Sequence, residues 1–486
     1  AASDVYKRQV HQNVGFEAID AASGKFRITN RFYFTNLKKY QIHYSVLSNN
    51  KTIKSGKVSL DIAPQASKEF TVPVNGLKSQ PGTEYFVNFS VTTVEPEPLI
   101  PAGYEIAYDQ FQLPIQAEKR IYKANGPALT TATSGDELTV SSSKVNFVFN
   151  KKSGLVTSYK VDGTEYFKDG FGIQPNFWRA PNDNDYGNGA PKRLQVWKQS
   201  SKNFHVTDVK MTTENKVVSL KATYLLAAGN LYVVTYRIYP SGIVNVSAQF
   251  TSTDMQAAET EVSEATRMAT FTPGSDAARK AASKLEVPRI GVRFRLPAQM
   301  NNVQYFGRGP EENYIDRNHG TLVGVYKTTA DKMYFNYVRP QENGHHTDTR
   351  WIALSPDKGN GLAIVADSLI GFNALRNSIE DFDSEEALPH PYQWNNFSPE
   401  EVANHDEKAA RNVLRRMHHV NDITPRDFVE VCVDMKQQGV GGYDSWGARP
   451  EPFHQIPANR DYSWGFTLVP VRSASQANEV AKYDYQ

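Results

Sequence analysis

The sequence predicts an all-β protein in which an immunoglobulin-like β-sandwich is followed by a larger antiparallel double-sheet domain. Short runs of alternating apolar and polar residues, bounded by turn formers, recur along most of the 486 residues. Aromatic residues reach 12% and β-branched residues are frequent, which also favours strands. Helical periodicity is scarce, and its candidates are residues 275–284 and 399–411.

Residues 10–116 carry six or seven strand-like runs at a spacing of about ten residues, a pattern typical of an immunoglobulin-like sandwich. Residues 117–136 are polar, contain Gly, Pro and Thr, and have little periodicity, so we expect a linker there. Strand-like runs then continue over residues 137–475 without an obvious second linker. We therefore expect one large domain after the linker, and a flexible tail over 476–486.

The N-terminal segment 1–9, "AASDVYKRQ", lacks an initiator methionine and the regions of a signal peptide. We expect it to be a non-native junction and the chain to be the C-terminal piece of a longer protein. Lysine plus arginine (54) nearly balances aspartate plus glutamate (52), so nucleic acid and anionic membranes are not expected partners. No stretch approaches the ~20 apolar residues of a membrane span. The single cysteine, Cys432, is predicted to be a small buried hydrophobe.

The stretch "FWRAPNDNDYGNG", residues 177–189, could bind a cation, cap a helix or form a loop beside a ligand. A calcium loop of the EF-hand type counted from Asp183 fails, because Gly187 falls at position 5 and Leu194 at position 12. A solvated turn built from turn-forming residues remains the plainer interpretation.

Four titratable residues form two adjacent pairs, Glu311 with Glu312 and His345 with His346. Neighbours on an extended chain point to opposite sides, so the glutamates do not fit a retaining glycosidase pair. The histidines lack a nearby cysteine or HExxH spacing, so we expect no metal site. No G-x-S-x-G, GxGxxG or P-loop motif occurs. Trp446, in the glycine-rich "GVGGYDSWGARP", could offer an open face to a sugar or fold back onto its own domain.

Several motifs, in this order and at these separations, together resemble the C-terminal half of the large bacterial β-galactosidases of glycoside hydrolase family 2, over residues 10–472. The motifs are "VHQN" (10–13), "VSLDIAPQ" (58–65), "FWRAPNDNDYG" (177–187), "VQYFGRGPEENYIDR" (303–317), "YVRPQENG" (337–344) and "GVGGYDSWG" (439–447).

The resemblance implies the last two of five domains: an immunoglobulin-like sandwich and a galactose-mutarotase-like β-supersandwich, the β-galactosidase small-chain domain. It also implies that the family's catalytic TIM barrel is not in this chain. The acid/base and nucleophile glutamates, Mg²⁺ and Na⁺ are expected in that barrel, so no catalytic or metal-ligating residue is assigned here. The full-length protein would hydrolyse terminal β-D-galactosides with retention, and this fragment alone would be inactive.

By the same resemblance, Trp446 matches the tryptophan that the last domain contributes to the galactose site. Asp185, Gly187 and Gly189 match a mobile loop at the edge of that site, with Arg179 to Asp185 as its anchor and the glycines as hinge material.

His345 and His346 are a departure from better-known members, and we expect them to line a pocket particular to this branch. A stand-alone carbohydrate-binding module or a mutarotase-like epimerase is the alternative function. Epimerisation would need an acid and a base from His345, His346 and Glu312. Expected partners are a β-galactoside substrate and the barrel of the same chain. Homo-oligomerisation, the galactoside linkage and the bacterial compartment, cytoplasm or periplasm, are left open.

Overall fold

The computed structural model describes residues 10–252, 285–383, 420–442, 444 and 447–485. Strands account for 48% and helices for 11%, so the prediction of an all-β protein is confirmed. Three predictions fall outside the described residues: the non-native junction at 1–9, the two helical candidates, and the position of Trp446. No helix in the described part is both long enough and apolar enough to span a lipid bilayer.

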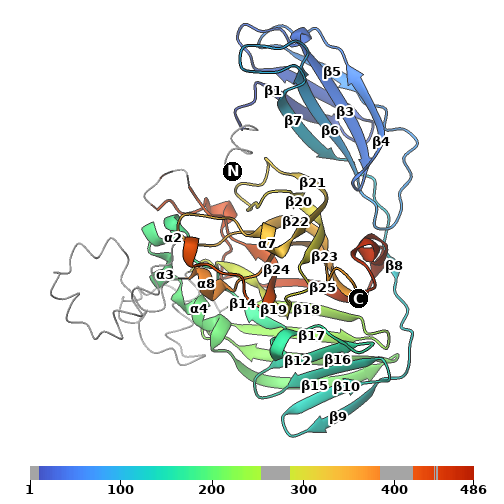
Figure 1. Ribbon diagram of the computed structural model, residues 1–486, viewed down its shortest axis with the longest axis vertical. Coiled ribbons are helices and arrows are strands. Elements are labelled where there is room, and N and C mark those ends of the chain that lie inside the picture. Colours follow the sequence, from blue (N-terminus) through green and yellow to red (C-terminus); the bar gives the residue numbers. More distant parts are fainter. Residues whose placement is uncertain (1–9, 253–284, 384–419, 443, 445–446, 486) are drawn as a thin grey trace, which may run out of the picture.

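The first domain is a two-sheet sandwich at one end of the molecule, drawn in blue (Figure 1). A three-stranded sheet of order β1-β2-β5 faces a four-stranded sheet of order β4-β3-β6-β7. Phe26 of the first sheet packs edge-on against Phe89 of the second, with ring centroids 5.0 Å apart. The elements are β1 (Val14–Asp20), β2 (Lys25–Asn30), η1 (Leu37–Lys39), β3 (Tyr40–Ser48), β4 (Lys51–Val58), β5 (Ser67–Thr71), β6 (Tyr85–Thr93) and β7 (Glu105–Gln112).

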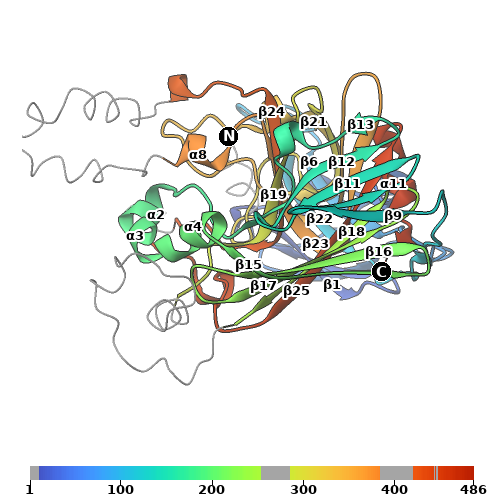
Figure 2. The same cartoon turned by 90° about the horizontal axis from the view of Figure 1, so that it is seen from below.

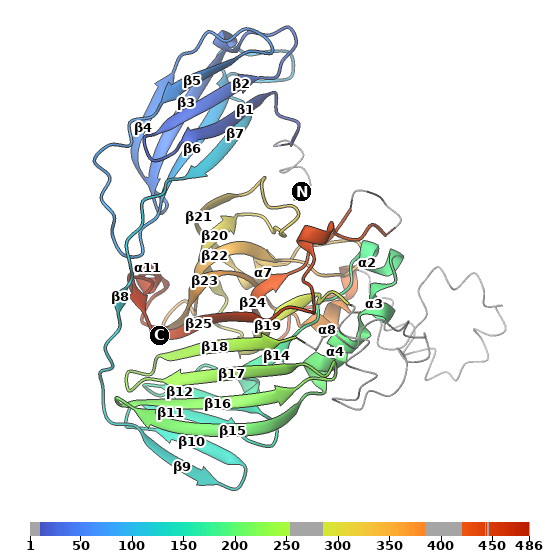
Figure 3. The same cartoon turned by 180° about the vertical axis from the view of Figure 1, so that it is seen from behind.

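The segment expected to be a linker carries two strands. β8 (Arg120–Ile121) runs along the side of the molecule, and β9 (Thr130–Ser134) already belongs to the second domain (Figure 3). β9 pairs antiparallel with β10 (Glu137–Ser141) over five residue pairs. All five β9 side chains are exposed and polar or small, so no apolar alternation marked this edge strand in the sequence.

The second domain packs a five-stranded sheet against a twelve-stranded one. Phe147 of the smaller sheet lies 5.7 Å from Tyr236 of the larger one, between ring centroids, inside one continuous apolar core. The smaller sheet consists of β9, β10, β11 (Val145–Asn150), β12 (Leu155–Val161) and β13 (Thr164–Glu165). The larger consists of β14 (Gln174–Asn176), β15 (His205–Glu214), β16 (Val217–Leu225), β17 (Leu231–Ile238), β18 (Val244–Thr251), β19 (Arg289–Pro297), β20 (Asn302–Gly309), β21 (Leu322–Thr329), β22 (His346–Ser355), β23 (Gly361–Leu375), β24 (Phe428–Gln437) and β25 (Tyr462–Val471).

The large sheet divides at β23. Residues 361–366 of this strand pair with β25, whereas residues 371–375 pair with β24. β22 pairs with β23, and β20 and β21 extend the sheet from β22 toward the first domain (Figure 1). The large sheet therefore branches at β23, with β24 and β25 paired to different parts of this strand.

The two domains are joined by direct contacts from β7 and β6 to the β20–β22 region. The Tyr108 hydroxyl donates to the Gly320 carbonyl at 2.7 Å. The Gln110 side chain donates to the Val323 carbonyl at 2.9 Å and accepts from the Val323 amide at 2.7 Å. These side-chain-to-backbone bonds fix the orientation of the first domain on the second.

The tail expected to be flexible is packed over its described part. It forms η7 (Ala474–Gln476), α11 (Ala477–Val480) and β26 (Tyr483–Asp484), which pairs parallel with β8. Ala477 and Tyr485 are buried, and the Tyr239 hydroxyl donates to the Tyr485 carbonyl at 2.6 Å. The prediction was wrong because the apolar and aromatic residues of this segment are too widely spaced to show a local period, yet they all reach one core.

The remaining helices are short and most of them gather at one end of the large sheet (Figure 2). They are η2 (Lys168–Gly170), α2 (Asp183–Gly187), α3 (Ala190–Arg193), α4 (Gln195–Lys202), α7 (Ala330–Met333), α8 (Ile379–Phe382), η5 (Val420–Asp422) and η6 (Pro452–His454).

Candidate functional site

The stretch singled out at 177–189 is anchored by a buried ion pair. Arg179 donates to both carboxylate oxygens of Asp185, at 3.2 Å from Nε and 2.9 Å from Nη2. The remaining guanidinium nitrogen, Nη1, donates to the Gln438 carbonyl at 2.8 Å. Burial disfavours the Arg179 charge, but the Asp185 carboxylate more than compensates and raises the pKa of Arg179. The pair therefore ties α2 to the loop that follows β24.

The Asn-Asp repeats form a capping box at the start of α2. The Asn182 side chain accepts from the Asp185 amide at 2.8 Å, and the Asp185 carboxylate accepts from the Asn182 amide at 3.1 Å. The segment expected to be a loop thus contains a capped helical turn, since Asn and Asp here satisfy the free N–H groups of a helix start. Asn182 and Asn184 also donate to the Val440 carbonyl, at 3.3 and 3.5 Å.

Glycines let this turn meet the loop that contains position 446. Gly447 has φ +111°, and a Cβ placed on it would lie 2.3 Å from the carbonyl carbon of Gly187 and 2.6 Å from the amide nitrogen of Asn188. Only glycine allows this backbone-to-backbone approach. Gly189 has φ +70° and lies between α2 and α3 with open space around it. The structure therefore brings Gly187 of the predicted site segment against the residue that follows Trp446.

The buried carboxylate of Glu286 also links α3, which follows α2, to the loop that contains Gly447. Glu286 accepts from Arg193 of α3 at 2.5 Å and from Arg449 at 2.9 Å. Burial alone would raise the pKa of Glu286, but Arg193 and Arg449 hold it below its ordinary value. Glu286 therefore stays ionised, and no local pattern in the sequence pointed to this role.

The two histidines predicted to line a pocket are instead buried, with 1% and 2% exposure. His345 Nδ1 lies 3.0 Å from the Asn373 side-chain oxygen, and its ring stacks on Tyr314. His346 Nδ1 lies 3.0 Å from the Gly344 carbonyl, and its ring packs between aromatic neighbours. Burial lowers the pKa of both residues, with the Arg289 charge adding to the effect at His345. Both rings are part of the packed interior of the described structure, so the pocket-lining prediction was wrong.

Glu312 is also committed to protein partners. It accepts from Arg317 at 2.5 Å, from the Gly344 amide at 2.7 Å and from the Tyr337 hydroxyl. A carboxylate with its acceptor positions used in this way is poorly placed to move a proton on a sugar. The residues named for an epimerase therefore do not face a common open site.

A buried charge network lies under these loops, and it was not predicted from the sequence. Arg289 lies 3.2 Å from Asp434 and 3.3 Å from Glu342, and its Nη1 donates to the Trp178 carbonyl at 3.4 Å. Burial raises the pKa of Asp434 to about 7, although Arg289 opposes the shift. One feature of the sequence could have indicated this network: two apolar strand runs, "RIGVRFRLP" and "FVEVCVDM", contain the charged residues Arg289 and Asp434. A charge within a buried strand needs a partner.

Metal binding has no support among the described residues. They contain no group of three or more His, Cys, Asp or Glu side chains that could hold an ion. Asp185 and Glu286, the buried carboxylates beside α2 and α3, are engaged by arginines. Cys432 is buried, as predicted, and burial raises the pKa of its thiol.

Comparison with known proteins assigns both domains. Residues 141–468 match the family described as "Beta galactosidase small chain", and residues 26–114 match "Beta-galactosidase, domain 4". This chain is a β-galactosidase small-chain family member. The predicted resemblance to a C-terminal portion of a bacterial β-galactosidase is thereby confirmed.

Two relatives of this chain are named β-galactosidase. A β-galactosidase of Priestia megaterium is 32% identical over 96% of this chain and 39% of its own length, and one of Streptococcus thermophilus is 24% identical over 91% and 37%. The chain thus spans less than two fifths of the relatives it matches. A galactose mutarotase related enzyme from Lactobacillus acidophilus aligns with a TM-score of 0.33 at 9% identity, covering 70% of this chain and 98% of that one. A TM-score of 0.33 is too low to support any inference about the activity of this chain.

Proposed function

We propose that this chain is the part of a retaining β-galactosidase that completes the galactose-binding site, while a TIM barrel elsewhere in the full-length protein supplies the chemistry. The contact between Gly447 and Gly187 supports this best, because Gly447, the residue after Trp446, then lies beside the capped turn of α2. Two ion-pair links, one between Arg179 and Asp185 and one from Glu286 to Arg193 and Arg449, connect the ends of this segment to the neighbouring loop.

In this proposal, the two catalytic carboxylates act as nucleophile and acid/base in the barrel, and Mg²⁺ and Na⁺ bind there. The described residues of this chain offer no fitting ligand set for either ion. The chain contributes an aromatic platform at Trp446 and a loop edge at Asp185, Gly187 and Gly189. The loop is proposed to move as the substrate enters, about Gly187 and Gly189, which precede α3.

The test uses the full-length protein and Trp446→Leu. Aromatic stacking contributes about 0.5–1.5 kcal/mol, so KM should rise about two- to twelvefold, with a smaller change in kcat. Trp464 is the control, because it is buried in the core and stacks on Phe466. Trp464→Leu should lower the Tm instead. An unchanged KM in a folded Trp446→Leu protein would show that this tryptophan only packs.

Retention is tested separately by NMR, which should detect β-galactose as the first product. This chain alone should release no galactose. It should also leave the mutarotation of freshly dissolved galactose at its spontaneous rate, and acceleration in polarimetry would support the epimerase instead.

A further inference from the structure

The loop over residues 334–344, between α7 and β22, contacts α2 through one arginine. The Arg339 guanidinium lies over the Tyr186 ring, with 3.6 Å between the guanidinium carbon and the ring centroid. Its Nη1 atom donates to the Asp183 carboxylate at 3.3 Å. Residues three apart lie on the same side of a helix, so this single arginine contacts two neighbouring positions of α2. A guanidinium that is stacked on a ring and paired with a carboxylate can hold a helical turn in one orientation.

The loop that carries this arginine is itself anchored on both sides of it. The Tyr337 hydroxyl donates to the Glu312 carboxylate, and the Gly344 amide donates to the same carboxylate at 2.7 Å. The Glu342 amide also donates at 3.3 Å to the carbonyl of Ala180, shortly before α2. The arginine therefore contacts α2 from a loop whose own position is fixed.

These contacts divide the candidate site segment into a held part and a turn. The buried ion pair described above holds α2 at Asp185, and Arg339 holds it at Tyr186. After Tyr186 the chain enters the turn of residues 187–189, in which Gly189 has φ +70° and open space around it. A movement of the loop edge is confined to this glycine turn as long as α2 stays in place.

We propose that Arg339 is a positioning residue of the galactose site. It acts through α2 and not on the sugar: it fixes the helical turn, so that only residues 187–189 move as the substrate enters. Its part in sugar binding rests on the function proposed above, whereas its hold on α2 is a property of this chain alone. The two are therefore measured separately.

Hydrogen exchange of this chain, followed by mass spectrometry, measures the hold on α2. The amides of Asp185 and Tyr186 report it, because both are bonded to Asn182. Arg339→Met removes the charge and the planar group, and exchange at these amides should accelerate roughly three- to thirtyfold, as for loss of an exposed cation–π contact together with an ion pair. Arg339→Lys keeps the charge without the planar face and should give a smaller acceleration. Asp183→Asn should also give a smaller one, because that carboxylate is 70% exposed.

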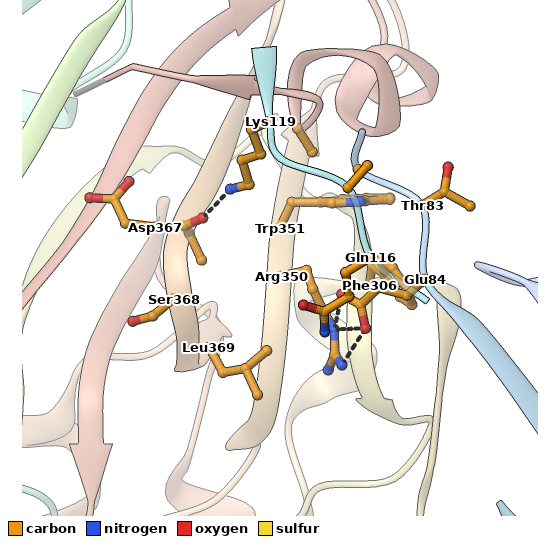
Figure 4. A pocket seen from close by; sticks show the side chains of 14 residues that line it. Thr83, Glu84, Gln116, Lys119, Phe306, Arg350, Trp351, Asp367, Ser368 and Leu369 are labelled. Carbon is orange, nitrogen blue, oxygen red and sulfur yellow. Dashed lines mark hydrogen bonds and ion pairs between the residues drawn. The ribbon is translucent and has the colours of Figure 1, made fainter. Parts of the chain in front are cut away.

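Arg350→Met is the matched control, because Arg350 also combines an ion pair with an aromatic ring. It donates to the Glu84 carboxylate, with the shortest contact 2.7 Å, and its guanidinium carbon lies 5.3 Å from the Phe306 ring centroid (Figure 4). This pair joins the first domain to β22 and does not contact α2. Its loss should lower the Tm but leave the exchange of α2 and the KM of the full-length protein unchanged.

Kinetics of the full-length protein show whether the hold on α2 matters for the sugar site. Arg339→Met should raise KM by up to the factor seen in exchange, with a smaller change in kcat, since a displaced loop edge weakens binding in the ground and transition states alike. Unchanged exchange of α2, or an unchanged KM in a folded Arg339→Met protein, would overturn the proposal. Failure of the proposed function is recognised separately, because Trp446→Leu would then leave KM unchanged as well.

Discussion

Replacing Gly447 by alanine tests the contact on which the proposed function rests. The substitution adds a Cβ at φ +111°, a conformation that costs L-residues about 1–3 kcal/mol. The new atom would also lie 2.3 Å from the Gly187 carbonyl carbon, and because that atom is backbone, α2 or the loop must move. We therefore expect the alanine variant to separate the loop from α2 rather than to unfold the domain.

Gly442→Ala is the matched control. It has nearly the same conformation, φ +114°, in the same loop, but its nearest neighbour is the Asn184 side-chain nitrogen at 3.4 Å, an ordinary contact. The difference between the two variants thus isolates the steric clash from backbone strain.

Hydrogen exchange of the α2 amides, followed by mass spectrometry, is the assay in this chain. Strain alone corresponds to a roughly 5- to 150-fold change in an opening equilibrium if it is expressed locally. Gly447→Ala should accelerate exchange at Asp185 to Gly187 clearly more than Gly442→Ala, and in the full-length protein it should raise KM more. Equal effects of the two substitutions on exchange would refute the idea that the backbone contact holds the turn in place.

Two further predictions concern stability. Burial raises the pKa of Asp434 to about 7 from 3.8, so its protonated form favours the folded state; the stability it contributes is fully present below about pH 4 and is lost as the pH rises through about 7. Asp434→Asn should flatten that decline in urea unfolding, and an unchanged slope would mean that Asp434 is ionised in the folded protein throughout this range. Deleting residues 474–485 should lower the Tm by several degrees, because a buried side chain such as Tyr485 contributes about 1.5–3 kcal/mol. An unchanged Tm would show that the packed tail adds nothing to the core.

The strand-rich domains could be predicted because their evidence is local. In β11, Val145, Phe147 and Phe149 are buried and alternate with half-buried residues, which is the alternation visible in the sequence. Cys432 was assigned to the interior for the same reason, as an apolar residue within a strand run. In β9, by contrast, every side chain is exposed, so nothing in the composition distinguishes this strand from a linker.

The candidate site was predicted only in part. Its residues 177–189 and the loop before Pro450 were found by motif, and the segment from Arg179 to Asp185 was expected to anchor the loop. The ion pair between Arg179 and Asp185 was seen only in the structure. Capping a helix was one of the possibilities for this stretch, but the sequence did not select it, because a capped turn and a solvated loop use the same Asn and Asp residues. His345 and His346 were expected to line a pocket because they depart from better-known members of the family, whereas Asn373 and the Pro310 carbonyl, from other segments, enclose them.

The sequence by itself determined the all-β class, the immunoglobulin-like first domain and the family, since alternation, turn residues and motifs are written along the chain. Tertiary structure alone decided which charges are buried and which loops meet. Arg179 finds the Gln438 carbonyl 259 positions away, and Arg289 finds Asp434 on a neighbouring strand. A buried charge is tolerated only where a partner reaches it, and that partner is supplied by the packing of distant segments rather than by local sequence.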